Sequence, residues 1–172
     1  DKTHPHRGLS PFTARNRTNI VRHNGEPPLS RILRGAAMYR VPNFIHVHAD
    51  HPLADPELIS ILFRSHAKNR ETPAYSCFRN APEWAAGGIV DMRELSRTVF
   101  GEKFKDETQT QPRDFFALRP EAFTLNSINL RYRGRWPEPG LSLAEPESEA
   151  ALHRALAKTA DPKNVSYKQL MS

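Results

Sequence analysis

The stretch Phe44-Ile45-His46-Val47-His48, followed by Pro56 to Lys68 and by Ala74 to Phe78, decides the fold of this chain. Its first five residues alternate aromatic or imidazole side chains with branched aliphatic ones, the period of two that is typical of a strand. A helix is expected next, because Asp55 can cap free N–H groups and proline suits the first helical position. The segments therefore predict a strand, a helix and a second strand, and the crossover makes the two strands parallel.

Length and composition limit the class of protein. The chain has 172 residues, enough for one domain with extensions, and its 15 prolines favour extended segments. Cys77 is the single cysteine, which excludes an internal disulfide and a Cys-x-x-Cys site. No run approaches the roughly 20 apolar residues of a membrane span, so we expect no transmembrane segment. The first residue, Asp1, fits either removal of a targeting peptide or a start further upstream.

Positive charge is concentrated in the N-terminal part of the chain. Residues 1–40 hold eight Lys or Arg and two Asp or Glu, whereas residues 41–172 hold 17 of each kind. Residues 1–28 also carry few large apolar side chains, so this segment cannot bury enough surface to order itself. We interpret residues 1–28 as an extended basic arm that is either solvated or ordered on RNA phosphates or on an acidic partner surface.

Residues 29–101 are predicted to form the core. Apolar residues at positions 29, 32, 33 and 36 share one side of a short basic helix. This helix could touch a membrane surface or fill a groove in an assembly, but packing on the domain is the favoured interpretation. Ile89 and Val90 are expected to add a short strand, and Asp91 with Glu94 indicates the start of a helix that ends at Gly101.

Residues 102–172 are predicted to form a C-terminal extension. Residues 102–113 are polar and indicate an exposed loop, and alternation at residues 122–125 and 128–133 predicts two strands. A Pro-rich run at residues 136–140 excludes regular pairing. Residues 145–158 begin with acids and end with cations, the charge order of a helix.

The histidines invite a metal site, but the sequence does not complete one. His46 and His48 share a face of the predicted strand, and His51 follows. A catalytic metal needs further ligands, and neither His66 nor His153 lies in a recognisable ligand context. No nucleophile elbow or phosphate-binding loop is present, and a mid-strand cysteine is typical of a structural one. The residues thus predict no metal, no catalytic group and no enzyme.

Four short motifs carry a family resemblance: Leu29-Ser-Arg-Ile-Leu-Arg34, Phe44-Ile-His-Val-His-Ala49, Pro73-Ala-Tyr-Ser-Cys-Phe78 and Gly88-Ile-Val-Asp-Met-Arg-Glu-Leu-Ser96. Together they resemble a thioredoxin-like family that has lost its redox cysteines. This family includes mitochondrial ribosomal proteins of both subunits and a small accessory subunit of respiratory complex I.

The tail selects within this family. Residues 119–141, with the run Gly134-Arg-Trp-Pro-Glu-Pro-Gly-Leu141, are similar to the tail of a small-ribosomal-subunit member. Some members use tail cysteines at an iron–sulfur site, and the corresponding positions here are Ile128, Leu130 and Glu138. Because none of these side chains replaces a thiolate, we expect no cluster and no other cofactor.

The resemblance implies an α/β fold with a thioredoxin-like mixed sheet, an extended basic N-terminal arm, and a Pro-rich C-terminal tail plus helix. It implies a non-enzymatic structural constituent of the mitochondrial small ribosomal subunit. In the mitochondrial matrix it would dock on neighbouring ribosomal proteins and ribosomal RNA, without a small-molecule substrate. The alternative is a matrix-side accessory subunit of complex I or of another inner-membrane assembly. The residues predicted to contact RNA phosphates are Arg7, Arg15, Arg17, Arg22, Arg31 and Arg34.

Overall fold

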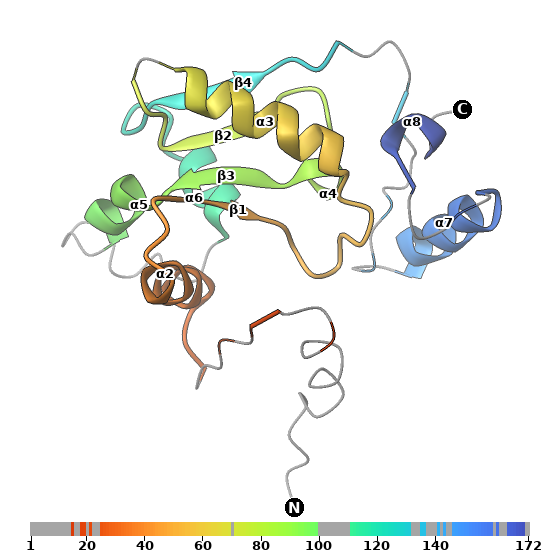
Figure 1. Cartoon of the computed structure of the whole chain (residues 1–172), viewed down its shortest axis with the longest axis horizontal. Helices are drawn as coiled ribbons and strands as arrows, with labels where there is room; N and C mark the ends of the chain where they lie inside the picture. Colours follow the sequence, from red (N-terminus) through yellow and green to blue (C-terminus); the bar gives the residue numbers. More distant parts are fainter. Residues whose placement is uncertain are drawn as a thin grey trace, which may run out of the picture.

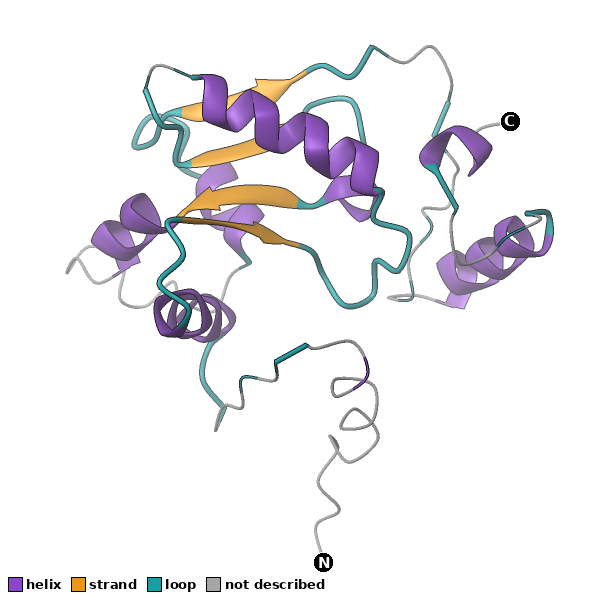
Figure 2. Ribbon diagram, viewed as in Figure 1, coloured by secondary structure: helices purple, strands orange, loops and turns teal. Residues whose placement is uncertain are grey.

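The computed structural model describes residues 15, 18–19, 21, 25–69, 71–99, 111–131, 135–136, 141, 143, 146–159, 161 and 165–170. Within these residues, four strands form one sheet with helices against both faces (Figures 1 and 2). The elements are α2 (Pro28–Met38), β1 (Asn43–His46), α3 (Pro56–Lys68), β2 (Tyr75–Phe78), α4 (Glu83–Ala86), β3 (Gly88–Asp91), α5 (Met92–Val99), α6 (Pro112–Ala117), β4 (Leu125–Ile128), α7 (Pro146–Ala157) and α8 (Tyr167–Leu170).

The sheet is mixed, with strand order β1-β3-β2-β4. Both β1 and β2 pair antiparallel with β3, while β4 pairs parallel with β2. The first two strands therefore run in the same direction, as the crossover predicts, but β3 lies between them. The predicted mixed α/β class is confirmed at this level.

Two glycines allow β3 to enter between its neighbours. Gly87 has a φ of +65°, and a Cβ there would lie 2.1 Å from the carbonyl oxygen of His46. At Gly88 a Cβ would lie 2.1 Å from the hydroxyl oxygen of Tyr75, whose ring lies against this glycine. The glycine pair is thus required by the close approach of β1 and of the Tyr75 ring.

Helix α3 covers one face of the sheet (Figure 1). Its start is as predicted, because Asp55 Oδ1 accepts hydrogen bonds from two backbone N–H groups of the first turn, at 2.7 and 3.2 Å. Leu58 and Leu62 are fully buried in the same apolar cluster as Ile89 of β3. Phe63 lies outside this buried face and leaves 48% of its surface exposed.

The opposite face is covered by α2 and α6. Leu29 and Leu33 of α2 are buried, which confirms that this amphipathic helix packs on the domain. Phe116 of α6 stacks on Tyr75 of β2, with ring centroids 5.3 Å apart. The prediction of an exposed loop up to Arg113 is wrong at its described end, because burial of the following phenylalanines draws these residues into α6.

The C-terminal extension contributes an edge strand and two helices. One strand, β4, replaces the two predicted strands, because pairing with β2 fixes it over four residue pairs. Helix α7 agrees with the predicted helix, whereas the short α8 is not predicted. The predicted helix end at Gly101, residues 102–110 and residues 137–140 lie outside the described residues. In the described part of the chain, every helix is too short or too polar to span a bilayer.

Candidate functional site

Ionisable side chains from separate segments meet where the β1–α3 connection, α4, α6 and β2 approach one another. The charge of Glu83 in α4 acts on His46, His51, Tyr75 and Cys77, which links the side chains of these segments electrostatically. The sequence scatters these side chains over about seventy positions, and the fold brings them together. We call the following set the edge cluster: His46, His48, Asp50, His51, Tyr75, Cys77, Glu83 and Arg113.

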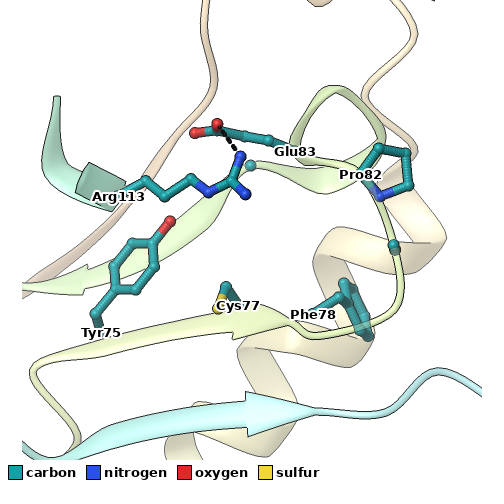
Figure 3. Close-up of a pocket in the computed structure, with 8 residues that line it drawn as sticks. Tyr75, Cys77, Phe78, Pro82, Glu83 and Arg113 are labelled. Atoms are coloured by element: carbon teal, nitrogen blue, oxygen red, sulfur yellow. Dashed lines mark hydrogen bonds and ion pairs between the residues drawn. The ribbon is translucent and has the colours of Figure 1, made fainter. Parts of the chain in front are cut away.

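A cavity of about 60 Å³ opens beside four members of the edge cluster, Tyr75, Cys77, Glu83 and Arg113 (Figure 3). Arg113 Nη1 donates a hydrogen bond to Glu83 Oε2 at 2.8 Å, which joins the start of α6 to the start of α4. The two side chains remain 54% and 24% exposed, respectively. The cavity is lined by Tyr75, Cys77, Phe78, Ala81, Pro82, Glu83, Gly87 and Arg113.

The strand residues at the cavity are neutral. Burial raises the pKa of the Tyr75 hydroxyl far above its usual range. Burial also raises the pKa of Cys77, although a hydrogen bond with Ser127 acts in the opposite direction. Cys77 is half-buried and lines the cavity, so it is more accessible than the predicted structural cysteine, but a protonated thiol is a weak nucleophile.

The three histidines that lie close together in the sequence also lie close together in space. The ring centroids of His46 and His48 are 6.3 Å apart, and those of His48 and His51 are 5.6 Å apart. His48 Nδ1 is hydrogen-bonded to Asp50 Oδ1, and His51 Nε2 lies 3.5 Å from the same oxygen. Burial lowers the pKa of His46 and of His51, although nearby carboxylates act to raise both values. Both rings can therefore accept a proton near neutral pH.

This group does not have the geometry of a metal site. Within the described residues, no three His, Cys, Asp or Glu side chains are placed to hold a metal ion. The shared contact with Asp50 instead orients the imidazoles of His48 and His51. The edge cluster can thus offer a guanidinium, the neutral imidazoles of His46 and His51, and two carboxylates to a ligand.

A second polar group lies under α3 and is closed to substrates. His66 Nδ1 lies 2.8 Å from Ser76 Oγ, a distance that also suits a nucleophile and its base. Ser76 is 0% exposed and His66 3% exposed, so no substrate can reach the hydroxyl. Asn126 Nδ2 donates to Ser76 Oγ at 3.2 Å, which completes a buried structural network.

The residues predicted to bind RNA are only partly described. Arg7, Arg17 and Arg22 lie outside the described residues, and Arg15 is exposed. On α2, Arg34 Nη1 donates to Glu26 Oε1 at 2.8 Å. The lining of the cavity includes none of these arginines, so RNA contact by the arm stays a prediction.

Sequence reasoning missed the central ion pair of the edge cluster. The sequence places Arg113 in a polar loop and indicates no role for Glu83, since neither lies in a recognisable motif. The only available signal is local: Pro82 and Pro112, each at the start of a helix, directly precede the two charged residues. Their pairing depends on contacts between elements that are 30 residues apart.

Comparison with known proteins shows that the fold is similar to that of an enzyme. No family model and no curated protein matches the chain. The structure is similar to that of a cytidylyltransferase from Leptospira borgpetersenii serovar Hardjo-bovis (strain JB197), with a TM-score of 0.76 and 15% sequence identity. The match covers 98% of this chain and 71% of the other. At this identity the likeness is one of fold.

This likeness contradicts the non-enzymatic prediction. It corrects three predictions: a structural constituent of the mitochondrial small ribosomal subunit, the complex I alternative, and the exclusion of an enzyme. The motifs behind that prediction describe separate helices and strands, and such elements are common to many α/β folds. The exclusion of an enzyme relied on local motifs, whereas the edge cluster forms only in three dimensions.

Proposed function

We propose that the chain is an enzyme of the nucleotidyltransferase type, with cytidine triphosphate (CTP) as the first donor to test. The observation that carries this proposal is the likeness of nearly the whole chain to a cytidylyltransferase. Fold alone does not assign a reaction, so the edge cluster must supply the chemistry.

The edge cluster supports phosphoryl chemistry through Arg113. In nucleotidyl transfer, an acceptor oxygen forms a bond to the α-phosphorus while the α–β phosphoanhydride bond breaks and pyrophosphate leaves. Negative charge on the phosphate oxygens needs a cation, and a guanidinium binds such oxygens through two parallel hydrogen bonds. The Arg113 side chain is 54% exposed beside the cavity, so its remaining N–H groups are accessible to a ligand.

The neutral imidazole of His46 suits the proton transfer. An acceptor hydroxyl must lose its proton as it attacks, and a positioned base accelerates this step. Burial lowers the pKa of His46, which keeps the ring unprotonated near pH 7. Arg113 is therefore assigned to phosphate binding. His46 does not line the cavity but lies within the electrostatic reach of Glu83, which makes it the candidate base for an acceptor bound beside the cavity.

Pyrophosphate release tests the proposal. The full chain is incubated with Mg²⁺, one of the four ribonucleoside triphosphates and a panel of phosphomonoester and alcohol acceptors. We expect release that depends on both the triphosphate and an acceptor, with CTP preferred. In Arg113→Gln the rate should fall about tenfold or more, the range for a lost hydrogen bond to a charged group.

A matched ion pair provides the control. Arg97 Nη2 donates to Glu94 Oε2 at 2.6 Å on α5, and neither residue lines the cavity. Arg97→Gln removes the same charge and should leave the rate unchanged. Absence of pyrophosphate release with every triphosphate and acceptor pair, from protein that unfolds cooperatively, would contradict the proposal.

Several finer predictions stay open beside this proposal. Three of them stay predictions from the sequence: the thioredoxin-like type of the fold, the family resemblance and a location in the mitochondrial matrix. A nucleotidyltransferase could occupy that compartment, so the location is compatible with the proposed reaction.

A further inference from the structure

The size of the cavity restricts what can enter it. Its volume is about 60 Å³. A cavity needs roughly 10–15 Å³ to hold one water, so this space is larger than a single-water site but far below the roughly 300 Å³ of a pocket that encloses a drug-sized ligand. One tetrahedral oxyanion has four oxygen atoms and fits this space, whereas a nucleoside does not.

The cation at this cavity already has an anionic partner. Glu83 Oε2 accepts a hydrogen bond from Arg113 Nη1 at 2.8 Å (Figure 3). A carboxylate presents two oxygens to a guanidinium in much the same way as a phosphate does. Glu83 is thus an internal competitor for any oxyanion that approaches Arg113.

We propose that the cavity is a subsite for a single phosphoryl oxyanion, and that Glu83 occupies the place of this ligand on Arg113 until the ligand displaces it. This inference rests on the proposed function, because it names the part of a nucleotide that the edge cluster receives. The nucleoside then lies outside the cavity, and the phosphoryl group enters it.

Exchange is favoured over simultaneous binding by the local charges. A phosphate beside an ion-paired Arg113 would also face the Glu83 carboxylate, and like charges at such distances repel. The ion pair is partly exposed, and pairs of this kind contribute little free energy, so a phosphate can replace the carboxylate at low cost. Released Glu83 remains close to His46 and His51, on which its charge already acts.

Titration calorimetry with inorganic phosphate, pyrophosphate, CTP and cytidine tests the inference on the full chain. Glu83→Gln should bind inorganic phosphate about two- to fivefold more tightly than the original chain, since it removes a competitor of modest strength. Arg113→Gln and the double variant should lose phosphate binding by about tenfold or more. Cytidine, which lacks a phosphate, should give no heat that depends on Arg113.

The control variant is Glu94→Gln, which removes the equivalent carboxylate from the Glu94–Arg97 pair on α5. It should leave phosphate affinity unchanged, and thermal unfolding should show that each variant is folded. The inference is overturned if Glu83→Gln fails to tighten phosphate binding, or if Glu94→Gln tightens it equally. Phosphate binding without any nucleotidyl transfer would instead sink the proposed function alone.

Discussion

At the scale of single residues, Asp55 connects three segments through its buried side chain and its backbone N–H. Its Oδ1 caps α3, while its Oδ2 accepts a hydrogen bond from the backbone N–H of Tyr167 at 2.6 Å. Its own N–H donates to the carbonyl oxygen of Ala85 at 2.7 Å. The sequence predicts the cap, because a cap is local. The contact with Tyr167 joins residues 112 positions apart, and no local pattern indicates it.

Replacing Asp55 should therefore cost more than an ordinary helix cap. Asp55→Ala is expected to lower the free energy of unfolding by about 2–4 kcal/mol, because it removes both the cap and the buried hydrogen bond that Oδ2 accepts from Tyr167 N–H. Asp55→Asn retains an acceptor oxygen and should cost about half as much. Urea denaturation measures both, and equal losses in the two variants would show that the hydrogen bonds matter less than the packing.

His66 should make stability depend on pH. Burial lowers the pKa of His66 in the folded chain, although Asp91 acts to raise it. Below the usual value of 6.5 the unfolded chain binds the proton first, so stability is complete above this pH and falls as the pH decreases through it. The pH dependence has this sign because the fold favours the neutral form of His66.

Unfolding free energies at several pH values test this expectation. His66→Gln should have a flatter pH dependence than the original chain between pH 6.5 and lower values. His153→Gln changes a side chain that is 70% exposed and should retain the original slope. An unchanged slope in His66→Gln would assign the pH dependence to other groups, such as His46 and His51.

At the scale of elements, the sequence predicts the features that local interactions determine, such as the starts of helices. The capped start of α3 and the Asp91 cap of α5 are found where the sequence places them. The order of the strands, by contrast, is not decided by local energies. It depends on whether β3 can lie against both β1 and β2. Likewise α6 has six residues and only becomes a helix because its phenylalanines are buried against Tyr75.

The position of β3 between β1 and β2 predicts how the chain responds to a side chain at Gly87. Gly87→Ala should destabilise the chain by about 2–4 kcal/mol, because the alanine has both a positive φ and a Cβ that collides with the β1 backbone. Gly25→Ala is the matched control, since Gly25 has a φ of +75° but nothing within 4 Å of the added Cβ. It should cost only about 1 kcal/mol.

Thermal or urea unfolding compares the two glycine variants directly. The expected order is a larger loss for Gly87→Ala than for Gly25→Ala. Equal losses would mean that backbone strain alone explains the effect and that β3 tolerates a shift away from His46.

At the scale of the whole molecule, the C-terminal segment closes back on the core. Tyr167 is buried in the cluster that holds Leu58 and Leu62, and Lys168 Nζ lies 2.8 Å from Glu57 Oε1. A chain that ends at Thr159 should be less stable by about 2–4 kcal/mol, because it loses buried apolar contacts and leaves Asp55 Oδ2 without Tyr167.

A point variant separates the two contributions of this segment. Lys168→Ala removes only an exposed ion pair and should change the free energy of unfolding by less than about 1 kcal/mol. If the truncation cost no more than this variant, the buried contacts of the segment would not stabilise the core.

The edge cluster also belongs to the scale of the whole molecule. The sequence identifies its histidines, because three of them lie within six consecutive positions. It does not identify Glu83 and Arg113, because their meeting depends on the packing of α4 and α6 around β2. The error about function has the same origin, since local motifs describe elements and the candidate site lies between them.

Equilibrium binding of CTP to the full chain and to Arg113→Gln is the most direct test of the central claim. We predict saturable binding by the original chain, binding at least about tenfold weaker in Arg113→Gln, and no change in Arg97→Gln. Binding that is absent for every ribonucleoside triphosphate, or that is equally strong in Arg113→Gln, would contradict the assignment of the edge cluster as a nucleotide site.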